Sequence, residues 1–263
     1  MIVQLEGQQS ILSALQSRQR KFKVVFIKAG AKAESFQELL SEAERQSVPL
    51  KYISAQEIEN LAHGKTHGGV IALCSPKRPN TFEDLEGIFR RVTNTPLLLL
   101  LEGVEDAQHL GYILRSAEAL GSQAMLLKKH LWDFDETAVA RASSGAFERL
   151  PLIRFSEASE MRNLDRFNIK LLGCIANAKR TIYETDLTEP VALAVGGEKR
   201  GLSGKLREHC HGFVKIPTAV EGASSLSLTH AACLLLGEAA RQRYSTPKSE
   251  IRKSKSESNS KNE

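Results

Sequence analysis

The sequence has few of the cysteines that mark disulfide-bonded or zinc-binding proteins. It contains four in 263 residues, and no two of them form a C-x-x-C pair. They are Cys74, Cys174, Cys210 and Cys233. Such wide spacing argues against both a disulfide framework and a zinc knuckle. We therefore expect four buried thiols and no metal site; the adjacent His209, Cys210 and His211 would point to different faces of a helix.

Long apolar runs and a targeting segment are also missing. A membrane-spanning helix needs roughly 20 apolar residues, whereas the most apolar stretch, Leu97 to Leu101, has the length of a buried strand. The first residues, Met1 to Ser10, lack the charged-then-apolar pattern of a signal peptide. We expect a cytoplasmic protein that does not contact the membrane.

The composition is that of an ordinary globular protein with an excess of positive charge. Hydrophobic residues make up 41% and charged residues 25% of the chain, which excludes wholesale disorder. A chain of 263 residues favours two domains over one or three. The net charge of +5 favours a polyanionic partner such as RNA.

Residues 1–76 are expected to form a small α/β domain. Their apolar positions alternate between helix-like and strand-like spacing, at Ile11, Leu12 and Leu15, at Val24 to Ile27, at Phe36, Leu39 and Leu40, and at Leu50 to Ile53. A glycine turn, His67-Gly68-Gly69, then leads into Val70 to Leu73, a strand that would close the sheet. The proline-rich composition that begins at Ser75 predicts a linker over 77–95.

Residues 96–243 are expected to form a parallel α/β sheet. Six apolar segments lack alternation, which indicates strands covered on both faces: Leu97 to Leu101, Ala124 to Leu127, Leu152 to Phe155, Lys170 to Ile175, Val191 to Val195 and Phe213 to Ile216. Helices are predicted over His109 to Leu120, over Ser203 to Cys210 with Ser203 as N-cap, and over Ser227 to Arg243. Residues 244–263 have almost nothing to bury and are predicted to be a disordered tail.

Three loops follow strands of this sheet, where parallel α/β proteins bind ligands. The first leaves Leu101, the second spans Val195 to Leu202, and the third starts at Ile216. Glycines in the second loop, at 196, 197 and 201, would let backbone approach a flat ligand closely. Their spacing, G-G-x-x-x-G, is not the dinucleotide fingerprint G-x-G-x-x-G, so a nicotinamide oxidoreductase is disfavoured.

These loops resemble the three motifs of the SpoU/TrmH RNA methyltransferases in order and spacing. The matching segments read E-D-A-Q-H-L-G-Y-I-L-R-S-A over 105–117, V-G-G-E-K-R-G-L-S over 195–203, I-P at 216–217 and S-L-S-L-T-H-A-A over 225–232. The resemblance covers 96–243, and residues 1–76 look like the family's ribosomal-protein-like substrate-binding domain. It implies a methyltransferase domain of the SPOUT type with a C-terminal trefoil knot, a homodimer, and S-adenosylmethionine as cofactor.

The resemblance also assigns residues. Cofactor contacts fall on Gly196, Ile216 and Leu226, and the loop glycines Gly197 and Gly201 join them. Arg115 matches the arginine near the target 2′-hydroxyl, Glu198 matches the glutamate of the second motif, and Ser227 lies at the reaction centre. Free arginine is a poor base, so we interpret Arg115 as orienting phosphate and polarising the hydroxyl. The alternative is a surface arginine that pairs with Glu118 or Glu105.

Two positions depart from the family pattern. His109 and Ser227 stand where the first and third motifs usually have asparagine. The main hypothesis is 2′-O-ribose methylation of structured RNA, with ribosomal RNA favoured over transfer RNA because of the N-terminal domain. The alternative is a knotted RNA-binding or ribosome-assembly protein in which the two replacements impair catalysis.

Overall fold

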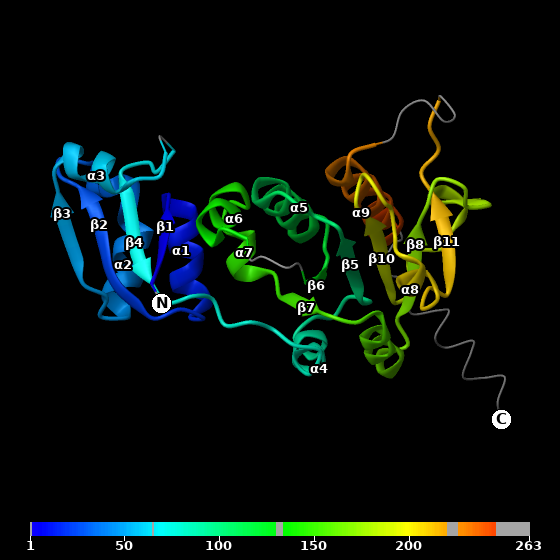
Figure 1. The fold of residues 1–263 in the computed structure, drawn as a ribbon. Coiled ribbons are helices and arrows are strands. Elements are labelled where there is room, and N and C mark those ends of the chain that lie inside the picture. The colour runs from blue at the N-terminus through cyan, green and yellow to red at the C-terminus, as the bar shows by residue number, and fades with distance from the viewer. Residues whose placement is uncertain (1, 65, 130–133, 220–225, 246–263) are drawn as a thin grey trace.

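The computed structural model describes residues 2–64, 66–129, 134–219 and 226–245 (Figure 1). The elements up to β4 gather at one side of the molecule, and the larger sheet lies at the other. Most of the predicted tail, residues 246–263, lies outside the described residues. No helix among the described residues is long and apolar enough to cross a membrane.

The N-terminal part is a four-stranded sheet with helices. Its elements are β1 (Val3–Glu6), α1 (Gln8–Ser17), β2 (Phe22–Lys28), η1 (Ala33–Phe36), α2 (Gln37–Arg45), β3 (Leu50–Ile53), α3 (Ala55–Leu61) and β4 (Val70–Cys74). The strand order is β1-β4-β2-β3. Strand β4 is antiparallel to both of its neighbours, and β2 is parallel to β3. The strand predicted at Val70 therefore lies inside the sheet, because β1, which the sequence pattern did not predict, occupies the edge.

The second part is built on seven parallel strands. Their order is β7-β6-β5-β10-β8-β11-β9, and every neighbouring pair is parallel. The strands are β5 (Leu97–Glu102), β6 (Ala124–Lys128), β7 (Leu152–Phe155), β8 (Lys170–Cys174), β9 (Arg180–Thr181), β10 (Val191–Gly196) and β11 (Gly212–Lys215). The prediction of a parallel α/β sheet behind a small α/β domain is confirmed; the trefoil knot stays a prediction.

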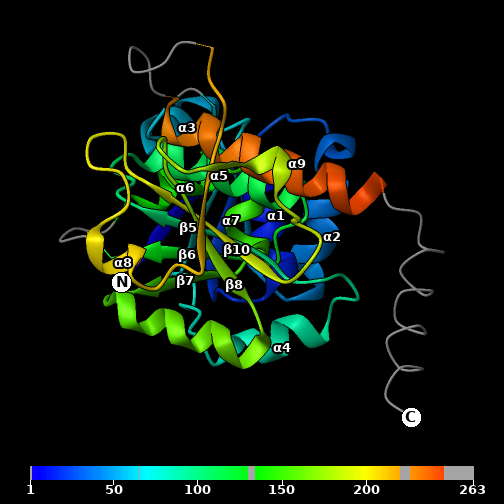
Figure 2. The same ribbon diagram turned by 90° about the vertical axis from the view of Figure 1, so that its right-hand side faces the viewer.

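Helices cover both faces of this sheet (Figure 2). They are α4 (Asp84–Arg90), α5 (Ala107–Ala119), α6 (Glu136–Ala142), α7 (Ala146–Arg149), η2 (Ala158–Phe167), η3 (Ile182–Glu184), α8 (Gly204–Arg207) and α9 (Leu228–Ser245). The leucines of β5 do not alternate with polar residues because both faces of this strand are covered. Leu97, Leu99 and Leu101 belong to the core under α5 and α9, whereas Leu98 and Leu100 belong to the core under α4 and η2.

The segment predicted as a linker, 77–95, is packed against the second domain over part of its length. Asn80 forms a β-bridge with Ile153 of the edge strand β7. Leu85 of α4 is fully buried, and the ring of Phe89 packs edge-on against Phe167 of η2 at 5.1 Å. The segment thus helps to cover the edge strand and the second face of the sheet.

The two domains meet where β1 and α1 pack against α6 and α7. Hydrogen bonds cross this interface from the Ser10 hydroxyl to the Ala140 carbonyl, at 3.0 Å, and from the Thr137 hydroxyl to the Gln4 carbonyl, at 2.7 Å. Arg20 lies at its centre, 2.9 Å from both Glu136 and Glu148. Because the side chains of Arg20 and Glu148 are fully buried, this ion pair depends on the domains staying together.

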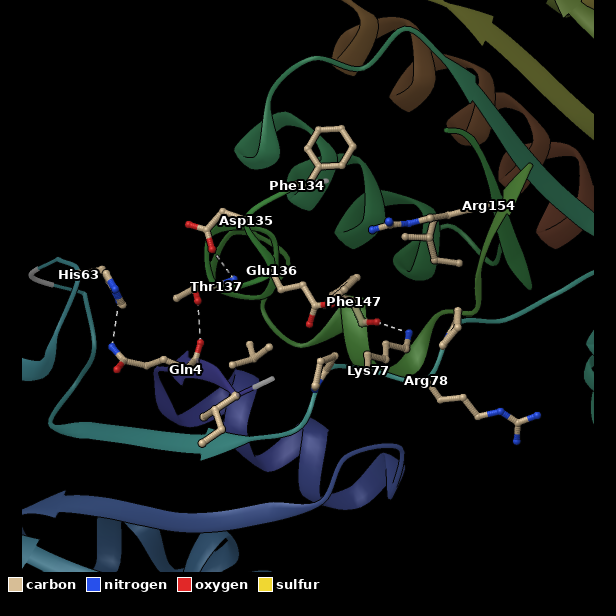
Figure 3. Close-up of a pocket in the computed structure, with 15 residues that line it drawn as sticks. Gln4, His63, Lys77, Arg78, Phe134, Asp135, Glu136, Thr137, Phe147 and Arg154 are labelled. Atoms are coloured by element: carbon tan, nitrogen blue, oxygen red, sulfur yellow. Dashed lines mark hydrogen bonds between the residues drawn. The ribbon is translucent and has the colours of Figure 1, made fainter. Parts of the chain in front are cut away.

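Lys77 is buried in the same interface, beside a cavity of about 650 Å³ that both domains line (Figure 3). Its ammonium group donates to the carbonyls of Phe147 and Leu150 and lies 5.1 Å from the ring centroid of Phe147. Burial lowers the pKa of Lys77 from 10.5 to about 8. The protonated form of Lys77 therefore loses more from burial than the neutral form does, so a proton on Lys77 weakens the packing of segment 77–95 onto α7.

This shift predicts that stability increases with pH above about 8. Between about pH 8 and pH 10.5, the unfolded chain keeps a proton that the folded chain has released, so the free energy of unfolding rises with pH. We expect a gain on the order of 2 kcal/mol from this group. Urea denaturation at pH 8 and pH 10 measures it, with Lys77→Met as the control that lacks the gain. Equal pH dependence in both proteins would contradict the prediction.

Candidate active site

A cavity of about 860 Å³ opens at the carboxyl ends of neighbouring parallel strands. Five segments line it: the end of β8 at 174–177, the loop after β10, Arg207 of α8, the end of β11 at 215–218, and the start of α9. The structure brings together there all five residues predicted to contact cofactor, which are Gly196, Gly197, Gly201, Ile216 and Leu226. Glu198 lines the same cavity.

The glycines of the second loop are required by close backbone contacts. A Cβ atom at Gly196 would lie 2.0 Å from the carbonyl carbon of Gly201, because the loop folds back on itself. A Cβ atom at Gly197 would lie 2.8 Å from the carbonyl oxygen of Gly103, in the loop after β5. Gly201 has φ +61° and donates its N–H to the Gly197 carbonyl at 2.8 Å. Two loops therefore touch backbone to backbone at the cavity wall.

Side chains tie the same two loops together. Glu102, at the end of β5, accepts hydrogen bonds from the Ser203 backbone N–H at 2.7 Å and from the Ser203 hydroxyl at 2.9 Å. The Ser203 oxygen accepts from the N–H of Leu206 at 3.3 Å, so the predicted N-cap is confirmed. The helix that it caps, α8, ends at Arg207 and not at the predicted Cys210. This network holds the glycine loop across the ends of β5 and β10.

Glu198 and Ser227 meet at the first turn of α9. One carboxylate oxygen of Glu198 accepts the backbone N–H of Leu228 at 3.1 Å. The Ser227 oxygen accepts the backbone N–H of His230 at 3.4 Å, as an N-cap does. It also lies 2.6 Å from Nδ1 of the His230 side chain. A carboxylate at this end of a helix is stabilised by the helix dipole, so Glu198 holds α9 against the second loop.

Arg115 lies on α5, which packs beside α9 in the same direction. The Cys233 thiol lies 3.2 Å from the Ser116 hydroxyl, and the Tyr244 hydroxyl lies over Gly121 just beyond α5. Arg115 is exposed and does not line the cavity. Its two alternative partners are engaged elsewhere, since Glu118 pairs with Arg149 and Glu105 with Lys199. The described residues therefore give no support to a surface ion pair of Arg115.

His109 is placed by the first turn of α5. Its backbone N–H donates to the Asp106 side chain at 2.8 Å, and its own side chain is exposed. Because Asp106 caps the helix, α5 begins at Ala107, two residues before the predicted start. His109 and Ser227 thus lie at the first turns of two parallel, adjacent helices.

Part of the cavity wall was not predicted from the sequence. Cys174 to Asn177 form one side, and the cations Arg200, Arg207 and Lys215 line it as well. The position of Cys174 at the end of a parallel strand is the signal that could have indicated this wall. Burial raises the pKa of the Cys174 thiol to about 11, so it stays protonated and is not a nucleophile at neutral pH. No group of metal-binding side chains occurs among the described residues.

The cavity suits S-adenosylmethionine in size and lining. Ligand cavities for molecules of that class measure about 300–1,000 Å³ and combine apolar walls with a few polar groups. Here the apolar wall includes Val195, Ile216 and Leu226, and the glycine loop presents backbone instead of side chains. A nucleoside can therefore lie flat against the loop.

Comparison with protein-family models decides which family this is. The model of the SpoU rRNA methylase family matches residues 96–237. The model described as "RNA 2′-O ribose methyltransferase substrate binding" matches residues 4–80. The chain belongs to the SpoU rRNA methylase family. The resemblance seen in the three motifs is confirmed, and both domain types of the family are present.

SpoU relatives of known name match over almost the whole chain. The 23S rRNA (guanosine-2′-O-)-methyltransferase RlmB of Haemophilus ducreyi is 35% identical over 248 residues, which cover 93% of this chain and 100% of the relative. The RlmB of Escherichia coli is 33% identical over 238 residues, 90% of this chain and 97% of that protein. Their shared length means that both domains are aligned.

Solved SpoU structures have the same fold. The crystal structure of an RNA 2′-O ribose methyltransferase superposes with a TM-score of 0.73 at 28% identity, covering 92% of this chain and 89% of that one. The SpoU methyltransferase AviRb from Streptomyces viridochromogenes, in complex with AdoMet, superposes with a TM-score of 0.76 at 25% identity, covering 93% and 92%. A protein of this fold thus binds S-adenosylmethionine.

Proposed function

We propose that this chain transfers a methyl group from S-adenosylmethionine to the ribose 2′-hydroxyl of a guanosine in 23S ribosomal RNA. The observation that carries the proposal is the convergence of the second and third motifs on one cavity, with the loop after β5 packed against the second loop at Gly103 and Gly197, in a chain that aligns with RlmB methyltransferases over 93% of its length. The reaction needs the methyl donor and the ribose oxygen held in line, with the hydroxyl proton removed as the oxygen attacks.

Residues of the second and third loops hold the cofactor in this proposal. The backbone at Gly196, Gly197 and Gly201 faces the nucleoside, and Ile216 and Leu226 enclose it. When bound, S-adenosylmethionine supplies a methyl group on a positively charged sulfur. Glu198 contributes by fixing the N-terminus of α9 through the Leu228 N–H, which positions Leu226 and Ser227.

Arg115 contacts the RNA. A guanidinium group stays protonated, and it presents a planar fork of donors that matches a phosphate. The exposed position of Arg115 on α5, without an acidic partner among the described residues, leaves that fork available. It orients the phosphate beside the target ribose and polarises the hydroxyl.

The domains divide the task. Residues 1–76 bind the RNA, 77–95 join the domains, and 96–243 carry out the transfer in the cytoplasm, where the ribosomal RNA is. The C-terminal trefoil knot and the homodimer are part of this proposal, on the resemblance to the family. The dimer is supported by apolar side chains on the outer face of α5 and α9, since Tyr112 is 47% and Leu234 is 42% exposed.

Incubation of the protein with tritiated S-adenosylmethionine and unmodified transcripts tests the proposal. We expect label in 23S rRNA and none in 16S rRNA or transfer RNA. Label in transfer RNA alone would overturn the substrate. Cofactor binding without transfer to any transcript would overturn the proposed activity. RNA binding without calorimetric binding of cofactor would support the alternative, an RNA-binding protein impaired by His109 and Ser227.

A further inference from the structure

A hydrogen-bonded serine and histidine stand beside the cofactor cavity, at the start of α9. The Ser227 oxygen lies 2.6 Å from Nδ1 of His230. Ser227 is half-buried and His230 is exposed. The neighbours of Ser227 in sequence, Leu226 and Leu228, both line the cavity, as does Ala231 one turn along α9. The pair therefore lies at the boundary between the cofactor cavity and solvent.

The proposed reaction leaves a proton without an acceptor. Arg115 is protonated and can only donate. One oxygen of Glu198 accepts the N–H of Leu228, and among the described residues no hydrogen bond joins Glu198 to the Ser227 hydroxyl. A neutral imidazole, in contrast, accepts a hydrogen bond at one nitrogen and can take up a proton there. Of these three groups, His230 is the one hydrogen-bonded to the Ser227 hydroxyl.

From this geometry we infer that His230 accepts the 2′-hydroxyl proton through Ser227, so that it is a proton-accepting residue that acts through its neighbour. The inference rests on the proposed function. As the 2′-oxygen bonds to the methyl carbon and the sulfur–methyl bond breaks, the hydroxyl proton passes to the Ser227 oxygen. The proton of Ser227 passes at the same time to Nδ1 of His230. The sulfonium charge is lost and an imidazolium charge appears, so that charge and atoms balance; the exposed ring then releases its proton to water.

Other titratable groups lie on the elements packed around this pair. They are His109, Tyr112, Arg115 and Glu118 on α5 and Glu198, Lys199 and Arg200 in the second loop. Among the described residues, the Ser227 hydroxyl makes its hydrogen bonds with His230 alone. The route to His230 is therefore the direct one from Ser227.

The pair could also be purely structural, with Ser227 capping α9. His230→Asn separates the two roles. The capping bond uses the backbone N–H of residue 230, which the variant keeps, and an asparagine oxygen near the place of Nδ1 still accepts from Ser227. Asparagine cannot take up the proton. A structural role predicts no change in rate, whereas a proton-accepting role predicts a loss.

Single-turnover methyl transfer to unmodified 23S rRNA, measured from pH 5.5 to 9, tests the inference. In the wild type we expect the rate to fall on the acid side, where imidazole becomes protonated. His230→Asn should be slower by about tenfold to a hundredfold at neutral pH, without that acid-side decline and with unchanged calorimetric affinity for cofactor. His109→Asn is the matched control and should keep the decline.

A second variant tests whether His230 acts through Ser227. Ser227→Asn removes the hydroxyl that joins His230 to the target oxygen, so adding His230→Asn to it should change the rate little. A large further loss in the double variant would show that His230 does not work through position 227 and would overturn the inference.

The tautomer of the His230 ring can be measured on the protein alone, without cofactor or RNA. Proton–nitrogen correlation spectra should show the proton on Nε2 in the wild type, with Nδ1 accepting from Ser227, and this pattern should change in Ser227→Ala. A proton on Nδ1 in the wild type would overturn the inference, as would an active wild type whose pH profile His230→Asn leaves unaltered. An inactive wild type would instead overturn the proposed function, and the inference with it.

Discussion

Arg115→Ala is expected to reduce methyl transfer by about a hundredfold to a thousandfold, the range seen when one charge-stabilising group is removed from an active site. Arg115 is exposed on α5, the helix that packs beside α9, and it does not line the cofactor cavity. Its loss should therefore leave cofactor affinity and oligomeric state nearly intact. Single-turnover rates with unmodified 23S rRNA, together with calorimetry of cofactor binding, measure both effects.

Arg115→Lys distinguishes geometry from charge. Lysine keeps the positive charge but loses the planar fork, so it should restore little of the rate. Arg149→Lys is a matched control. Arg149 lies on α7 and pairs with Glu118 of α5, the helix that carries Arg115, and it is not assigned to RNA. Near-normal transfer by Arg115→Ala would return Arg115 to a surface role and remove α5 from the active site.

Arg20→Ala is expected to lower the free energy of unfolding by about 3–5 kcal/mol, because it leaves a buried carboxylate without its partner. Glu148 is fully buried, and both of its oxygens accept from the Arg20 guanidinium. Burial opposes the charge on Arg20, but the hydrogen bonds and charge of Glu148 outweigh it and raise the pKa of Arg20. Urea denaturation followed by circular dichroism measures the loss.

The double variant Arg20→Met, Glu148→Leu is the control for this ion pair. Replacing both charges with apolar side chains of similar volume is often neutral, so most of the lost stability should return. If Arg20→Ala alone cost less than about 1 kcal/mol, as an exposed pair would, the interface would not depend on this buried pair.

The larger sheet was predictable because its strands are buried on both faces. The run Leu97 to Leu101 has no alternation since successive leucines enter different cores, and such runs are rarely anything but covered strands or buried helix. β7, Leu152–Phe155, was predicted to the residue. The two-residue strand β9 was not predicted, because it is too short to show a period.

Elements whose order depends on tertiary contacts were missed. β1 has four residues and forms by pairing with β4, which is distant in sequence. α4 has seven residues and lies in a segment whose prolines suggested a linker, yet burial of Leu85 against the second core orders it. Lys77 looks like an exposed linker residue in sequence, and only the position of α7 explains its burial.

The candidate site divides in the same way. The glycine loop and the ends of β10 and β11 could be located from the sequence, because parallel strands present their carboxyl ends at one edge. The partner of Ser227 could not be located from the sequence. The first turn of α9 brings the His230 ring to the Ser227 oxygen, and this contact is seen only in the structure. Nor could the sequence show that Glu118 and Glu105 are engaged by Arg149 and Lys199.

Mapping of 2′-O-methyl groups in RNA tests the central claim most directly. Total RNA from cells with the gene and from cells lacking it is compared at single-nucleotide resolution, with a strain carrying Arg115→Ala as a third sample. We predict one guanosine in 23S rRNA that loses its methyl group both in the deletion strain and in the variant strain. Identical methylation of ribosomal RNA in all three samples, or a lost site in transfer RNA only, would contradict the account.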